Sequence, residues 1–141
     1  MDNKLSKAVL VGIAGSNNAF SLSIYNLKSF AYNDPEIRDK WDISIIQHPL
    51  INVNRKDMEV LPLIDRIVNA KPDLVGFSCY MWNVNVFDEI AQALRKRIPV
   101  KIIDFDMVFP GKCAYIHSPV IKIHKFRVVV NTIEYIAIIF I

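Results

Sequence analysis

The sequence predicts an α/β fold built on a doubly wound parallel sheet with helices on both faces. Short, uniformly apolar runs alternate with helical patterns between residues 8 and 103, and such runs are typical of strands buried on both faces. Strands that alternate with helices at this spacing are joined by right-handed crossovers. A chain of 141 residues is also long enough to bury a core without disulfide bonds.

The first strand is expected at residues 8–14, which form a continuous apolar run. A polar turn follows at residues 15–18, and Ser16 or Asn17 is a candidate cap for the next helix. Apolar residues near helical spacing place that helix between residues 20 and 32.

The next segment contains a polar hinge at residues 33–36, which ends the first helix or starts a short second one. A second strand is expected at residues 41–46, and His48 just beyond it is interpreted as a surface or capping residue. The following helix is expected at residues 57–70, with Pro62 near its start, where proline is tolerated.

The third strand is expected at residues 74–77, before Ser78, and a helical pattern begins at Asn83. Three basic residues, 95–97, end this helix, where cations complement the helix dipole; a nucleic-acid patch is the less favoured interpretation. A fourth strand begins at residues 100–103. This order of elements predicts a Rossmann-like or flavodoxin-like fold.

The pattern changes near the fourth strand. From Ile98 to the end there are 11 isoleucines and no leucine, whereas leucine occurs nine times before it. No amphipathic helix follows, and the strand-like pieces lie at residues 120–123, 126–130 and 135–141. We therefore expect an α/β domain at residues 1–103 and an atypical apolar tail at residues 104–141. That tail is expected either to add strands or to be out-of-frame sequence from a truncated gene.

Composition and charge narrow the function classes. The 17 basic and 14 acidic residues leave a net charge of +3, which is too small to indicate nucleic-acid binding. The two cysteines form no Cys-x-x-Cys pair, and the polar start has no signal-peptide core. The most apolar stretch, residues 126–141, is shorter than a membrane span and is interrupted by charges. We expect a cytoplasmic protein with no membrane partner.

The candidate ligand site lies in the loops after the first and third strands, because open α/β sheets bind ligands outside the carboxyl ends of their strands. The first loop could offer backbone amides to an anion but lacks the third glycine of a dinucleotide fingerprint. Simpler alternatives are an ordinary strand-to-helix turn and aromatic rings packed over the sheet edge. The expected ligand-facing residues of these two loops are Gly15, Ser16, Asn17, Ser78, Cys79, Tyr80, Trp82 and Asn83.

A family resemblance rests on two stretches. These are KPDLVGFSCYMWNVNVFDEIAQALRKRIP at residues 71–99 and NLKSFAYNDPEIRDKWDISIIQ at residues 26–47. Both resemble the N-terminal cobalamin-binding domain of vitamin-B12-dependent radical SAM proteins. The resemblance implies that strand-end loops hold the corrin ring, with Ser78 matching the family's serine after the third strand. A large flat amphiphile of this kind needs aromatic walls and a few polar groups.

Three departures from related proteins shape this expectation. The Asp-x-His-x-x-Gly motif of histidine-ligated cobalamin modules is absent, so cobalamin is expected without a protein histidine on cobalt. The Gly-Gly pair that admits the nucleotide tail is replaced by Asp104-Phe105-Asp106, which would obstruct an anionic tail. The Cys-x-x-x-Cys-x-x-Cys motif of the radical SAM barrel is absent.

The resulting expectation is a cobalamin-binding module without the catalytic barrel, with a radical SAM domain encoded downstream as its partner. The alternative is a cofactor-free α/β remnant or a protein-interaction domain. Neither catalytic nor metal-ligating residues are assigned. Cys113, His117 and His124 have irregular spacing, and Asp104 and Asp106 lack the other acidic and lysine residues of a receiver-like cation site.

Overall fold

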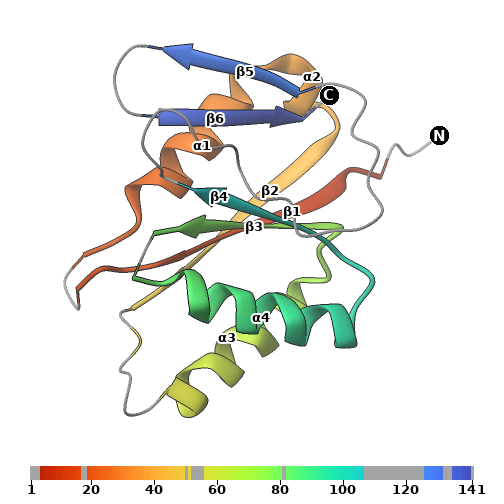
Figure 1. Cartoon of the computed structure of the whole chain (residues 1–141). Helices are drawn as coiled ribbons and strands as arrows, with labels where there is room; N and C mark the ends of the chain where they lie inside the picture. The colour runs from red at the N-terminus through yellow and green to blue at the C-terminus, as the bar shows by residue number, and fades with distance from the viewer. Residues whose placement is uncertain are drawn as a thin grey trace.

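The structure, a computed structural model, describes residues 4–16, 19–49, 51, 56–80, 82–106, 126–131 and 135–140. Its main unit is a four-stranded parallel sheet in the order β2-β1-β3-β4. The strands are β1 (Ser6–Ile13), β2 (Trp41–His48), β3 (Leu74–Cys79) and β4 (Lys101–Asp106). The predicted Rossmann-like or flavodoxin-like α/β fold is confirmed (Figure 1).

The helices connect these strands and cover both faces of the sheet. They are α1 (Leu22–Tyr32), α2 (Pro35–Arg38), α3 (Lys56–Ala70) and α4 (Val84–Arg97). Figure 1 shows α3 and α4 together on one face, with α1 and α2 on the other. The chain passes from β1 outward to β2 and then crosses back to β3 on the opposite side of β1. The direction of winding therefore reverses between β1 and β3, which makes their carboxyl ends the topological switch point.

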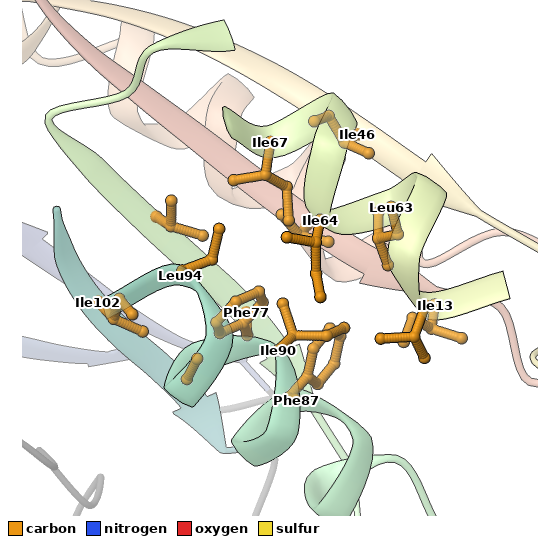
Figure 2. Packing of buried hydrophobic residues seen from close by; sticks show 14 of the residues in the cluster. Ile13, Ile46, Leu63, Ile64, Ile67, Phe77, Phe87, Ile90, Leu94 and Ile102 are labelled. Atoms are coloured by element: carbon orange, nitrogen blue, oxygen red, sulfur yellow. The ribbon is translucent and has the colours of Figure 1, made fainter. Parts of the chain in front are cut away.

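Each face of the sheet has its own core because successive strand side chains point to opposite faces. The α3–α4 face buries Val9 and Val11, whereas the α1 face buries Ala8 and Leu10. The larger core lies against α3 and α4 (Figure 2) and is formed mainly by branched aliphatic side chains and two phenylalanines. These residues include Ile13, Ile46, Leu63, Ile64, Ile67, Phe77, Phe87, Ile90, Leu94 and Ile102.

Two element boundaries differ from the expected ones. Helix α1 begins at Leu22 with Ser21 at the N-cap, so Ser16 is not its cap, and Asn17 lies outside the described residues. Helix α3 begins at Lys56, which places Pro62 inside the helix rather than near its start. A proline there removes one backbone hydrogen bond and costs about 3 kcal/mol. Burial of Val60, Leu63, Ile64 and Ile67 on the same helix offsets this loss.

The regular elements that the structure describes after α4 are strands rather than a helix. Strand β4 runs to Asp106, past the expected boundary at residue 103. Strands β5 (Phe126–Asn131) and β6 (Tyr135–Phe140) pair antiparallel in a separate sheet, and β6 lies beside α1 (Figure 1). These two strands coincide with the strand-like pieces at residues 126–130 and 135–140, whereas residues 120–123 and 141 lie outside the description. The out-of-frame origin of this segment stays a prediction.

Strand β2 lies at an edge of the sheet, and the Tyr32 hydroxyl covers part of its outer side. Ser6 N–H donates to Lys40 O, and Ala14 N–H donates to His48 O. In β2, the backbone N–H and C=O groups of the even-numbered residues therefore point toward β1. The backbone of Ile43 therefore points outward. The Tyr32 hydroxyl accepts a bond from Ile43 N at 3.2 Å and donates to Ile43 O at 3.4 Å. It thus occupies two groups that an added strand would use.

Substitution of Tyr32 by phenylalanine is expected to lower the free energy of unfolding by about 1–2 kcal/mol, because it removes the one hydroxyl that bonds both backbone groups of Ile43. Chemical denaturation measures this change, and size-exclusion chromatography reports any self-association through the uncovered β2 edge. Tyr25→Phe, an exposed tyrosine on the same helix, is the matched control. Equal stability of the two variants would contradict the role given to Tyr32.

Candidate functional site

The loops after β1 and β3 lie at the same edge of the sheet. Ala8 to Val11 pair in parallel with Leu74 to Phe77, so both strands end on the same side. A Cβ atom built on Gly15, in the first loop, would lie 3.6 Å from Cζ2 of Trp82 in the second. The predicted placement of Gly15 and Ser78 at one edge is therefore confirmed. Ligand binding at this edge stays a prediction.

Four hydroxyl groups meet at this edge and form what we call the hydroxyl cluster: Ser21, Ser23, Ser78 and Tyr80. The Oγ atoms of Ser23 and Ser78 are 2.6 Å apart, and those of Ser21 and Ser23 are 3.0 Å apart. Ser21 Oγ donates to Ser78 Oγ at 3.2 Å. The Ser23 and Tyr80 hydroxyl oxygens are 3.4 Å apart. Ser21 and Ser78 are buried, whereas Ser23 and Tyr80 are partly exposed.

The close approach of α1 to β1 depends on Gly12. A Cβ atom on Gly12 would lie 2.5 Å from Ser21 Cβ and 2.8 Å from Ile24 Cδ1. The absence of a side chain at Gly12 therefore lets the start of α1 sit directly on β1. The backbone N–H of Ser21 donates to Gln47 Oε1 at 2.9 Å, which ties the same point to the end of β2.

Asn83 shapes the turn between β3 and α4. Its side chain is 1% exposed; Oδ1 accepts from the Tyr80 N–H at 2.7 Å, and Nδ2 donates to Ser78 O at 3.3 Å. These two bonds fix the backbone on either side of Cys79. Tyr80 stacks on Trp82 with ring centroids 5.6 Å apart and an interplanar angle of 10°. Trp82 is 49% exposed, so the stacked pair borders the hydroxyl cluster on its solvent side.

The structure brings most of the expected site residues together, with one clear exception. Gly15, Ser78, Tyr80, Trp82 and Asn83 meet at the switch point, as described above. Ser16 is exposed in the first loop, and Asn17 lies outside the described residues. Cys79 instead belongs to the core on the α3–α4 face. Neighbouring strand residues point to opposite faces, so Ser78 and Cys79 cannot both face one ligand.

Sequence reasoning missed Ser21, Ser23 and Gln47. Two of these are serines at the start of α1, and parallel topology places a helix start at the same edge as the ends of its flanking strands. The spacing Ser21-x-Ser23 after a glycine-containing strand end was the available signal.

The expected surface position of His48 is wrong. Its side chain is buried at the end of β2, and Nδ1 lies 2.7 Å from Pro49 O. Because a carbonyl oxygen only accepts hydrogen bonds, Nδ1 carries the proton in this arrangement. The reason for the burial is the length of β2, which extends through His48 rather than ending at residue 46.

Metal-ligating side chains do not gather in the part of the chain that the structure describes, where no group of three His, Cys, Asp or Glu residues could hold an ion. Cys113, His117 and His124 fall outside the described residues. Asp104 and Asp106 lie on β4, in register with Phe77 and Cys79. Within the described ranges, no helix is both long and apolar enough to span a membrane.

Neither a protein-family model nor a curated protein matches this chain. The fold and the site define it as a Rossmann-like α/β protein whose described switch point is rich in hydroxyl groups and carries an aromatic pair.

Proposed function

We propose that this chain is the cobalamin-binding module of a radical SAM-type enzyme, and that a separate radical SAM domain supplies the catalytic iron–sulfur barrel. The observation that carries the proposal is the position of the hydroxyl cluster and the Tyr80–Trp82 stack at the switch point of the sheet. Ligands of open α/β sheets bind at this point. The resemblance of residues 71–99 to cobalamin-binding domains agrees with that position.

The side chains at the site suit the corrin part of cobalamin. A corrin is flat and carries uncharged amide groups on its rim, so it needs an apolar wall and neutral hydrogen-bonding partners. The half-exposed Trp82 offers the wall, and the partly exposed Ser23 and Tyr80 offer the hydroxyl groups. Bound cobalamin supplies a cobalt centre for group transfer. The role of this chain's own residues is to bind and orient the corrin.

The nucleotide tail of cobalamin fits this chain less well. Where the resembled family has a glycine pair, Asp104-Phe105-Asp106 forms the end of β4. Phe105 is in register with Ser78, and Asp106 is in register with Cys79. The negative charges of two aspartates on this strand end disfavour the anionic phosphate of the tail. We therefore propose that binding depends on the corrin and gains little from the tail.

A second candidate function is protein interaction without a cofactor. Four large apolar side chains are 42–62% exposed on α1 or just before it: Phe20, Leu22, Tyr25 and Phe30. An exposed apolar surface of this kind is typical of a contact with another protein. This candidate predicts self-association or partner binding without any affinity for corrinoids.

The test is titration of the purified chain with hydroxocobalamin and with cobinamide, which lacks the nucleotide tail, followed by the corrin absorbance. We expect the two corrinoids to bind with affinities within about threefold of each other, because the tail adds little. Replacing Asp104, Phe105 and Asp106 together with glycine is expected to strengthen the binding of hydroxocobalamin only. Absence of binding to both corrinoids would refute the proposed function. Equal affinity for hydroxocobalamin before and after the substitution would refute the hypothesis that the end of β4 hinders the nucleotide tail.

A further inference from the structure

The hydroxyl cluster has one weak contact at its exposed side. Ser23 lies 2.6 Å from Ser78 Oγ and 3.0 Å from Ser21 Oγ, but 3.4 Å from the Tyr80 hydroxyl. Hydrogen bonds between hydroxyl groups are most favourable near 2.7–2.8 Å, so the Tyr80 contact is the weakest of the four. It also joins the two partly exposed members of the cluster, whereas Ser21 and Ser78 are buried.

We propose that the Tyr80 hydroxyl occupies the position of a ligand's uncharged hydrogen-bonding group, and that ligand binding displaces it from Ser23. This proposal rests on the proposed function, because it assigns the ligand-contacting hydroxyl of that same site to Ser23. Ser23 keeps its two short contacts within the cluster and exchanges the Tyr80 oxygen for an oxygen or nitrogen of the ligand.

The chemistry of the cluster selects the class of ligand group. Its members are neutral serine and tyrosine hydroxyls, and the neighbouring Gln47 and Asn83 are neutral amides. A phosphate or carboxylate placed here would lose water and would find no cationic partner among these described residues, which is unfavourable. A primary amide or a hydroxyl group loses less hydration free energy than an anion does. It also finds both hydrogen-bond donors and acceptors in the cluster. The amides on a corrin rim belong to this class.

The backbone around Tyr80 allows its ring to move while the site keeps its shape. Asn83 holds the Tyr80 N–H at 2.7 Å and the Ser78 carbonyl at 3.3 Å, so the turn stays in place. Displacement of the hydroxyl then requires rotation of the Tyr80 side chain rather than rearrangement of the loop. Because Trp82 stacks on Tyr80, this rotation changes the environment of the indole.

The experiment compares three variants in the hydroxocobalamin titration. Tyr80→Phe keeps the ring but removes the displaced hydroxyl, so we expect affinity to rise about two- to tenfold, the usual range for one neutral hydrogen bond. Ser23→Ala removes the ligand-contacting group and is expected to lower affinity by a similar factor. Ser29→Ala, an exposed serine on the same helix, is the control and leaves affinity unchanged. Unchanged or weaker binding by Tyr80→Phe would overturn the proposal.

A measurement without ligand separates this proposal from the proposed function. In a Trp41→Phe background, Trp82 is the sole tryptophan, because the chain has two. Acrylamide quenching of Trp82 is expected to increase in Tyr80→Phe, since the ring pair loses its anchor on Ser23. An increase supports the displaceable contact even if no corrinoid binds. Unchanged quenching shows that the hydroxyl does not hold the pair and counts against the proposal.

Discussion

Replacing Gly12 with alanine is expected to lower the free energy of unfolding by about 2–3 kcal/mol, since overpacking of a filled site forces neighbouring atoms to move. The new Cβ would lie 2.5 Å from Ser21 Cβ and 2.8 Å from Ile24 Cδ1. Ser21 Cβ is attached directly to the backbone and cannot rotate away, so the start of α1 must shift. Ile24 is 1% exposed, and a shift therefore also disturbs the core beneath α1.

The matched control is Gly15→Ala, in the loop that follows β1. A Cβ there would be 3.6 Å from Trp82 Cζ2, an ordinary contact. Alanine gives the unfolded chain fewer conformations than glycine does. The substitution should therefore leave the free energy of unfolding unchanged or raise it by about 0.4–1 kcal/mol. Urea denaturation of both variants measures the difference. If Gly12→Ala were as stable as Gly15→Ala, the start of α1 would not depend on contact with β1.

The same shift should be visible at the site. Ser21 carries a hydroxyl of the cluster, and its N–H donates to Gln47 Oε1. Moving Ser21 away from β1 separates it from Ser78 on β3. Gly12 thus links the packing of α1 to the geometry of the candidate site, although its own atoms bind nothing there.

The fold was predictable from the sequence because each main strand and helix has a pattern of its own. The apolar runs that became β1 and β3 are buried along nearly their whole length, and the helical spacing of α4 matches its buried residues Phe87, Ile90 and Leu94. The spacing of apolar residues along the sequence reflects which side chains are buried. Burial of apolar side chains is also the main source of stability for these elements, so the sequence pattern predicts them.

The site was predictable only in part because it depends on contacts between distant residues. Ser78 and Trp82 could be assigned from their place after a buried strand, whereas Ser23 meets them only through the winding of the sheet. Which face of the sheet the Cys79 side chain lies on depends on where β3 ends. The expected strand stopped before Ser78, but the observed strand includes Ser78 and Cys79. The Tyr32 contact with Ile43 carries no local pattern at all.

Replacing Phe87 with alanine is expected to have the largest effect on stability, a loss of about 3–5 kcal/mol. Phe87 is 1% exposed and stacks on Phe77 with ring centroids 4.6 Å apart and an interplanar angle of 27°. Figure 2 shows both rings among the aliphatic side chains of α3, α4 and the sheet. The substitution removes the ring contact and leaves a cavity that these side chains fill only partly.

Phe30→Ala is the control for this substitution, because it deletes the same atoms from a side chain that is 43% exposed on α1. It is expected to cost less than about 1 kcal/mol, since much of that ring is already in water. Thermal and urea unfolding of the two variants compare these values directly. If both variants lost a similar amount of unfolding free energy, the packing of α4 on β3 would contribute no more to stability than the exposed face of α1 does. The helix that follows the Asn83 turn would then not be what holds the second loop of the candidate site in place.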